Sequence, residues 1–392
     1  MRQPHAALAD QVSDPTNTTY DLETPDNLIC PAQDIFDRAH IQTALDACLA
    51  TPTNLLEDRA NVVEILLTAR KSGMDAIETA FEAKPFAAHE ATATYSWLTD
   101  CLIETTFAVA LRQISPEKAK GLRMSLIAVG GYGRGEMAPQ SDVDLLFLTP
   151  SAITKPAETI IETMLYILWD LRLKVGHASR TIDDCLHLAG EDFTIRTSLL
   201  EHRFLAGDAA LAKNLDNRLW KELFKGTERE FIEAKLDERD IRHEKQGGQR
   251  YVVEPNVKEG KGGLRDLQSL FWIAKYVYDV RTAAELVDKG VFTADEFDTF
   301  QQAQDFLWTV RCHLHLISKR AMDQLTFDMQ VEVGAAMGYA DATGRRAVEH
   351  FMQDYFRHAT RVGDLTRIFL TAQEAELHKS EPSLLRIFSR KK

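Results

Sequence analysis

The chain has 392 residues, of which 45% are hydrophobic and 27% are charged, and its formal net charge is −13. This composition is typical of a soluble globular protein with two or three domains. The acidic balance argues against broad electrostatic attraction to nucleic acid or to an anionic membrane. Five scattered cysteines, no apolar run long enough for a membrane span and no signal-peptide pattern at the start predict a cytoplasmic protein.

The first third of the chain has two different compositions. Residues 1–34 are rich in Pro, Thr, Asn and Asp and predict a loose arm. Residues 35–113 combine helix-forming composition with apolar residues at three- and four-residue spacing. We expect this second segment to be a helical lead-in to the next domain.

From about residue 124 the hydrophobic pattern changes to short β-prone runs bounded by Gly and Pro. The runs at 125–131 and 142–148 predict two neighbouring strands, 158–173 predicts a helix, and 174–182 predicts a third strand. The rest of the chain reads as helical, interrupted at 250–266 by a short strand and a Gly/Lys-rich loop.

This pattern predicts an α+β protein that is mostly helical, with a small α/β unit embedded between helical regions. The expected divisions are the arm at 1–34, the lead-in at 35–113, a catalytic domain at 114–205, a helical domain at 206–373, and a basic tail at 374–392.

The segment "VGGYGRGEMAPQSDVDLLFL" carries the strongest chemical signal. Asp142 and Asp144 are one residue apart at the start of a predicted strand, so both side chains point to the same side. Two such carboxylates repel each other and are costly to bury unless a cation lies between them. Oxygen ligands suit Mg²⁺, which takes further ligands from water and phosphate. We therefore interpret the pair as a site for Mg²⁺ or Mn²⁺.

The residues around the pair predict phosphate contacts. Gly130 and Gly131 lack a Cβ, so a phosphate can approach their backbone amides. Arg134 lies in the following turn, where its guanidinium can contact a phosphate in bidentate fashion. Ser141 precedes the pair and is included among the expected nucleotide contacts.

A glycine pair followed about ten residues later by Asp-apolar-Asp-apolar resembles the signature of the polymerase-β-like nucleotidyltransferase superfamily. The resemblance implies a glycine turn that holds a triphosphate and aspartates that hold two metal ions. Such ions stabilise the attacking and leaving oxygens during displacement at phosphorus.

Four longer strings resemble one bacterial family within this superfamily, the bifunctional PII uridylyltransferases/uridylyl-removing enzymes. They are "GGYGRGEMAPQSDVDLLFL", "LKVGHASRTIDDC", "VEPNVKEGKGGLRDLQSLFWIAKY" and "RCHLHLISKRAMDQLTFDMQ". The resemblance covers about residues 60–370 and implies transfer of UMP from UTP to a tyrosine of the PII signalling protein. The family also has a hydrolytic HD domain and glutamine-sensing ACT domains, which we do not expect in this sequence.

Two parts of the site stay open at this stage. The superfamily uses a third carboxylate from a neighbouring strand, and the sequence offers Asp183, Asp184, Glu254 and Asp266 without distinguishing among them. The loop "KEGKGGLRD" places Lys258 and Arg265 beside glycines and before an apolar helix, so it predicts a second phosphate contact.

The motifs also leave the base and the acceptor open. Adenylyl or other nucleotidyl transfer to a different protein is one alternative to uridylyl transfer. A non-catalytic nucleotide-binding regulatory module is the alternative from a different class. His313 and His315, two apart in a helical run, are interpreted as ordinary structural histidines.

Overall fold

The computed structural model describes residues 24–50, 54–114, 122–249, 251–342 and 344–380. Most of the predicted arm therefore lies outside the described residues. Its described end is packed onto the protein, because the Ile29 side chain is buried and its backbone N–H donates to Thr94 Oγ1 over 3.0 Å. No helix among the described residues is long and apolar enough to cross a membrane.

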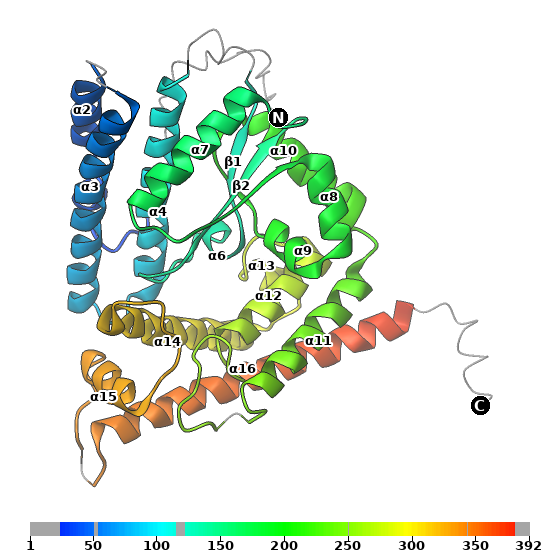
Figure 1. Cartoon of the computed structure of the whole chain (residues 1–392). Coiled ribbons are helices and arrows are strands. Elements are labelled where there is room, and N and C mark those ends of the chain that lie inside the picture. Colours follow the sequence, from blue (N-terminus) through cyan, green and yellow to red (C-terminus); the bar gives the residue numbers. More distant parts are fainter. Residues whose placement is uncertain (1–23, 51–53, 115–121, 250, 343, 381–392) are drawn as a thin grey trace, which may run out of the picture.

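A four-stranded mixed sheet forms the centre of the upper half of the molecule (Figure 1). Its order is β3 (Val175–Thr181), β2 (Val143–Thr149), β1 (Ser125–Ala128) and β4 (Arg203–Gly207). Strand β1 is antiparallel to both β2 and β4, whereas β2 and β3 are parallel. Parallel strands need a crossover connection, and α7 (Lys155–Asp170) supplies it.

The strands predicted at 125–131, 142–148 and 174–182 are confirmed, with slightly different ends. The prediction missed β4, whose five residues are too few for a clear period-2 pattern. The short strand predicted near residue 251 is wrong, because this segment makes only an isolated bridge between Asn256 and Gln324. Pro255 and the three glycines of this segment disfavour a longer ladder.

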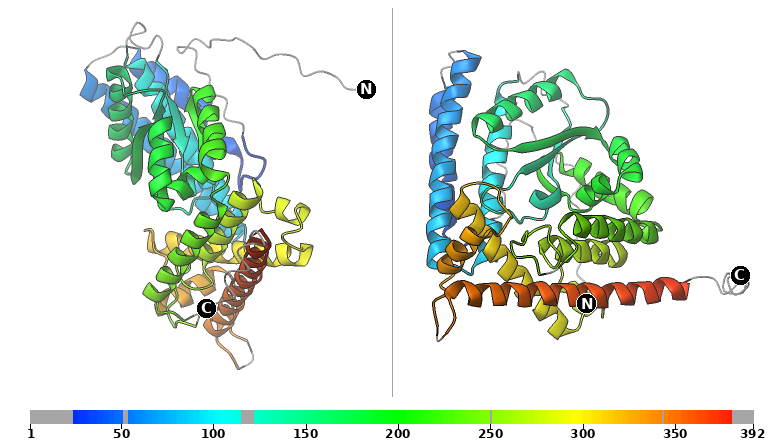
Figure 2. Two further views of the ribbon diagram at one scale, coloured as in Figure 1. Left: turned by 90° about the vertical axis from the view of Figure 1, so that its right-hand side faces the viewer. Right: turned by 60° about the horizontal axis from the view of Figure 1, so that its bottom comes forward.

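The helices before the sheet form an upright layer at its side (Figures 1 and 2). Long helix α4 is buried along nearly its whole length and packs against α3, α7 and α14. The bounds of this layer are α1 (Ala32–Ile35), α2 (Arg38–Leu49), α3 (Leu55–Ala83) and α4 (Ala88–Arg112).

The helices after β3 wrap the other side of the sheet and then form the lower half of the molecule. Helix α16 runs along the lower edge, beneath α14 (Figure 2). Their bounds are α8 (Ile182–Glu191), α9 (Phe193–Leu200), α10 (Ala209–Arg218), the π-helical turn η1 (Leu219–Phe224), α11 (Glu228–Lys245), α12 (Leu264–Tyr278), α13 (Glu285–Asp288), α14 (Ala294–Ser318), α15 (Phe327–Ala336) and α16 (Ala347–Ser380).

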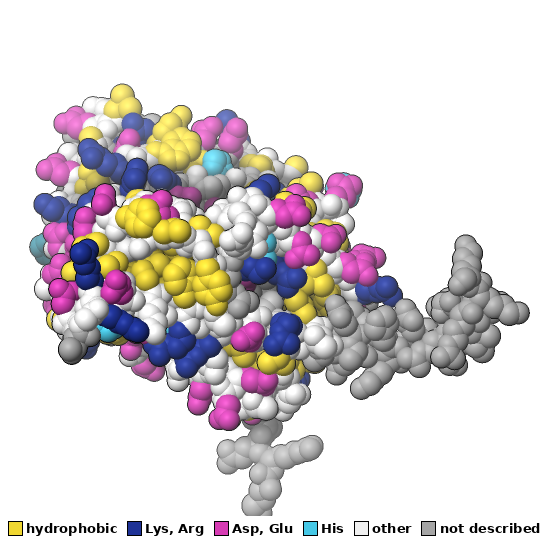
Figure 3. Space-filling view, turned by 90° about the horizontal axis from the view of Figure 1, so that it is seen from below, with side chains coloured by type: hydrophobic (Ala, Val, Ile, Leu, Met, Phe, Trp, Pro, Cys, Tyr) yellow, Lys and Arg dark blue, Asp and Glu magenta, His cyan; other side chains and the backbone are white. Residues whose placement is uncertain are grey.

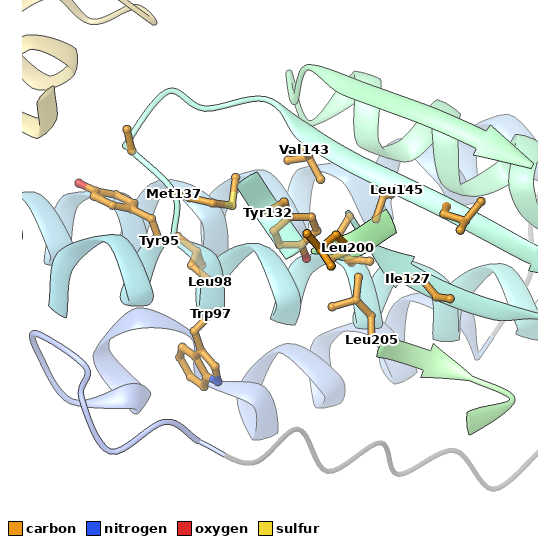
Figure 4. Close-up of a cluster of buried hydrophobic side chains, with 14 of the residues drawn as sticks. Tyr95, Trp97, Leu98, Ile127, Tyr132, Met137, Val143, Leu145, Leu200 and Leu205 are labelled. Carbon is orange, nitrogen blue, oxygen red and sulfur yellow. The ribbon is translucent and has the colours of Figure 1, made fainter. Parts of the chain in front are cut away.

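The apolar core is continuous from the sheet to the flanking helices. Figure 4 shows Ile127, Leu145, Leu200 and Leu205 meeting around the ring of Tyr132, the residue that follows the glycine pair. Burying this ring fixes the glycine turn against the sheet. On the lower face, by contrast, acidic and basic side chains alternate with an apolar band (Figure 3).

Candidate active site

The glycine pair forms a single helical turn, α6 (Gly130–Gly133), directly after β1. Gly130 has φ +60°, a left-handed conformation that glycine adopts readily. A Cβ at this position would lie 3.5 Å from Asp144 Oδ2 and 3.9 Å from Ser198 Oγ. The turn therefore faces the second aspartate of the motif. Ser198, on α9, was missed by the sequence prediction because no motif contains it.

Asp142 and Asp144 lie at the start of β2 in different surroundings. Asp142 is exposed, Asp144 is half-buried, and Val143 between them is buried toward the core. This alternation places the two carboxylates on the same side of the strand. Burial, followed by the negative charge of Asp142, raises the pKa of Asp144 above its ordinary value. The protein therefore compensates the negative charge of the Asp142–Asp144 pair only in part.

Strand β3 leaves room for the Asp144 side chain. Gly176 is the register partner of Asp144, and a Cβ on Gly176 would collide with Asp144 Oδ1. The β3 residue directly beside Asp144 is thus a glycine and not a carboxylate. This relation was not visible in the sequence because it depends on the register set by the α7 crossover.

Lys258 comes from a loop far along the chain and acts on Asp144. Its positive charge lowers the Asp144 pKa, which partly offsets the effects of burial and of Asp142. Burial, then Arg311 and Arg265, lower the pKa of the lysine itself. The negative charge of Asp323 also acts on Lys258 and raises its pKa. The positive charge of Lys258 is therefore shared between Asp323 and Asp144 and does not fully neutralise Asp144.

The loop that carries Lys258 is anchored by a compensated cluster at the end of α14. Asp323 Oδ1 accepts from Arg311 Nε over 2.7 Å and lies 3.3 Å from His315 Nε2, while the Asp323 carbonyl accepts from Val257 N–H over 2.8 Å. Burial alone would raise the pKa of Asp323, but His315 and Arg311 outweigh it and hold the pKa below its ordinary value.

His315 also connects this cluster to the turn before the aspartates. Its Nδ1 accepts the Gln140 N–H over 3.3 Å, which leaves the proton on Nε2 facing Asp323. Burial lowers the His315 pKa and favours this neutral form. These contacts are consistent with the prediction that His315 is a structural histidine. They also join it to the turn before Asp142, a connection that the sequence did not indicate. His313 contacts the Pro85 carbonyl instead.

The remaining predicted phosphate contacts are already engaged with the protein. Arg134 is paired with the buried carboxylate of Glu201 and, over 3.2 Å, with Glu136. Ser141 Oγ accepts from Ala138 N–H over 3.0 Å. Arg265 donates to Glu259 over 3.2 Å and lies over the Trp272 ring. Contact of these side chains with a nucleotide stays a prediction.

The four candidates for a third carboxylate have structural partners. Asp183 pairs with Arg218, Asp184 caps α8, Glu254 accepts from Phe327 N–H, and buried Asp266 contacts Arg242 and His243. Within the described part of the chain, no three His, Cys, Asp or Glu side chains converge as a metal site. The protein side of the candidate metal site is therefore the pair Asp142 and Asp144.

A cavity of about 700 Å³ lies beside the glycine turn. Its lining includes Arg134, Glu136 and Glu201, but neither motif aspartate is among its described lining residues. Glu136 and Glu201 are bound to Arg134 here, and Glu136 also accepts from Gln304 over 3.0 Å. Glu90 and Asp305 are the other carboxylates of this lining, and the motif pair Asp142 and Asp144 lies outside it.

A small mixed sheet, a glycine turn and a carboxylate pair at the start of the following strand define a nucleotidyltransferase domain. In agreement, residues 110–190 match the nucleotidyltransferase domain family, and residues 230–370 match the GlnD PII-uridylyltransferase family. Over most of its length the chain is similar to part of the bifunctional uridylyltransferase/uridylyl-removing enzymes.

Relatives with this name occur in several bacteria. The chain is 59% identical over 360 residues to the one from Ruegeria pomeroyi, covering 91% of this chain and 40% of the relative. It is 56% identical over 369 residues to the one from Cereibacter sphaeroides, covering 93% and 40%. The relative from Novosphingobium aromaticivorans is 46% identical over 351 residues, covering 89% and 38%. The chain thus spans about 40% of the length of these curated relatives.

Proposed function

We propose that this chain transfers UMP from UTP to a tyrosine hydroxyl of the PII nitrogen-signalling protein, with release of pyrophosphate. The tyrosine oxygen bonds to the α-phosphorus, the bond from this phosphorus to the bridging oxygen breaks, and the hydroxyl proton is released. The names of the relatives and the match over residues 230–370 support this substrate pair. UTP is available in the cytoplasm, where we place the reaction.

One observation carries the chemical part of the proposal. The glycine turn faces the Asp144 carboxylate, and the charges of Asp142 and of Lys258, from a separate segment of the chain, both act on it. An exposed carboxylate and a half-buried one on the same side of a strand suit a divalent cation, because the cation relieves their repulsion. Lys258 then provides positive charge for the triphosphate at the same place.

The residues fit Mg²⁺ or Mn²⁺, with Asp142 and Asp144 as the protein ligands. When bound, such ions would supply charge stabilisation for the transferring phosphoryl group. Water and phosphate oxygens would complete the coordination, since β3 presents Gly176 next to the pair. The N–H groups of Gly130 and Gly131 are the expected backbone contacts for the triphosphate, with Arg134, Ser141 and Arg265 as additional contacts.

The positions of the aspartate pair and of Lys258 suggest a role for each domain. We propose that residues 114–205 form the catalytic nucleotidyltransferase domain, and that 206–373 form a helical domain that contributes Lys258. The arm (1–34), the lead-in (35–113) and the tail (374–392) complete this proposed division. Helix α16 nevertheless continues to Ser380, beyond the proposed start of the tail.

The test is a transfer assay with the full chain, purified PII protein and either labelled UTP or labelled ATP, with Mg²⁺ or with a chelator. We expect label on a PII tyrosine only with UTP and metal. Label from ATP would instead identify an adenylyltransferase. Nucleotide binding without any transfer would support a regulatory module and contradict the proposal.

A further inference from the structure

A second, smaller pocket lies on the other side of the turn that precedes Asp142. Its volume is about 170 Å³, room for roughly five or six water molecules. Its wall includes Met137, Ala138, Pro139, Gln140, Ser141 and Val143. Val143 points away from the two carboxylates, so this pocket is on the opposite face of the strand start from the proposed metal site.

The pocket is cationic although the whole chain is acidic. Basic side chains from α3, from the α7–β3 connection and from the end of α14 converge on it. They are Arg70, Arg172, Lys174, Lys319 and Arg320. Of these, Lys319 already pairs with Glu78 over 2.6 Å, and Arg320 Nη2 lies 3.4 Å from Met322 Sδ. The structure gives the side chains of Arg70, Arg172 and Lys174 no partner among the described residues.

Two of the lining groups lack the partners that buried polar groups require. Tyr95 is 3% exposed, and its hydroxyl has no hydrogen-bond partner within the described part of the protein. Figure 4 shows the Tyr95 ring at the margin of the core, with its hydroxyl directed away from Tyr132. Arg70 is half-buried, and burial lowers its pKa with no carboxylate to oppose the effect. Both groups can donate to an acceptor, and the guanidinium of Arg70 favours one with negative charge.

The backbone at the rim points to the same conclusion. Three described residues other than glycine have positive φ, and two of them are Arg172 (58°) and Lys319 (53°). Both follow the end of a helix, a position where glycine is favoured because it has no Cβ. Cationic side chains occupy these strained positions and line the pocket.

We propose that this pocket binds a small polyanion with phosphate-type or carboxylate-type oxygens, and that the bound anion stabilises the turn leading to Asp142. The size suits an anion such as pyrophosphate. The turn is held internally by Ser141 N–H donating to the Ala138 carbonyl over 3.0 Å. An anion that bridges α3 and this turn would link the helical layer to the aspartate segment.

The first experiment measures binding of pyrophosphate to the full chain by calorimetry, in chelator and without nucleotide. We expect saturable binding that weakens about tenfold or more in Arg70→Met, because a charge-assisted contact is lost. Lys71→Gln is the matched control, since Lys71 is an exposed cation on the same helix outside the pocket, and it should change the affinity less than twofold. Equal effects of the two variants would overturn the proposal.

Lys258→Gln separates this pocket from the proposed active site. If pyrophosphate occupies the pocket near Tyr95, Lys258→Gln leaves its affinity within about twofold. If Lys258→Gln removes the binding and Arg70→Met does not, the anion site is the active site and the proposal fails. The outcome is independent of transfer activity, so it is distinguishable from failure of the proposed function.

Tyr95→Phe gives a readout that does not depend on charge. Because the hydroxyl has no internal partner, this variant should keep or raise the melting temperature without anion, while losing most of the stabilisation by pyrophosphate. Parallel titrations with inorganic phosphate and succinate then distinguish phosphate-type from carboxylate-type ligands. If none of the three anions binds saturably, the pocket holds only water and the inference is wrong.

Discussion

Two aspartates that both interact with the charge of Lys258 show how differently this protein compensates partly buried carboxylates. Asp323, after α14, is held by Arg311 and His315, and its pKa is lowered. Asp144, in β2, has another carboxylate beside it and a shared lysine, and its pKa is raised. The negative charge of Asp323 is compensated within the protein, whereas that of Asp144 requires a cation from solution.

This difference separates the structural role from the functional one. A compensated carboxylate holds two segments together and gains nothing from a ligand. An uncompensated one costs stability in the free protein and recovers it when a cation binds. We therefore expect substitutions at Asp144 to affect activity far more than stability, and substitutions at Asp323 to do the reverse.

The largest expected effect is that of Asp144→Asn on transfer. Removing this ligand charge should lower the rate of UMP transfer by at least about a hundredfold, because charge stabilisation at the phosphoryl group is lost. The melting temperature should stay the same or rise. Asp183→Asn is the control, since Asp183 is exposed and pairs with Arg218, and its transfer rate should be close to normal. Near-normal transfer by Asp144→Asn would contradict the assignment.

Asp323→Asn should have the opposite profile, with stability reduced by about 2 to 4 kcal/mol because buried Arg311 loses its partner. Chemical denaturation measures this change. The lowered pKa means that wild-type stability from Asp323 is present at neutral pH and is lost as the pH falls below about 4 and through the folded-state pKa. A variant as stable as wild type would show that the cluster does not anchor the loop.

Gly176→Ala sharpens the geometry around Asp144. The added Cβ would collide with Asp144 Oδ1, so the carboxylate must move, and transfer should fall about tenfold. Gly190→Ala is the matched control, because nothing lies within 4 Å of a Cβ there. If the two variants have equal transfer rates, Asp144 does not need its observed position.

The smallest expected effect is on the pH dependence of stability of the metal-free protein. Since the Asp144 pKa is raised, wild-type protein gains stability from protonating Asp144 at low pH and loses that gain as the pH rises through the folded-state pKa. Asp144→Asn should therefore be more stable relative to wild type at pH 7 than at pH 4. Denaturation curves at several pH values in chelator test this sign, and a difference that shrinks toward pH 7 would contradict it.

Local patterns were enough to predict β1, β2 and β3 and to select the two aspartates. They could not show that the charge of Lys258 acts on Asp144, because this interaction depends on how the helical region folds back onto the sheet. They also could not show that Arg134 is bound to Glu201, a pairing set by the junction of α9 and β4. The third carboxylate stayed open for the same reason, since only strand register reveals Gly176 beside Asp144.

The most direct test of the central claim is a titration of Mn²⁺ into the full chain with a nonhydrolysable UTP analogue, followed by electron paramagnetic resonance. We propose that Asp142 and Asp144 form the metal-binding pair of a nucleotidyltransferase site. We expect tight Mn²⁺ binding by wild type and by Asp183→Asn, with affinity reduced at least about tenfold in Asp144→Asn. Equal Mn²⁺ affinity in all three proteins would contradict the claim.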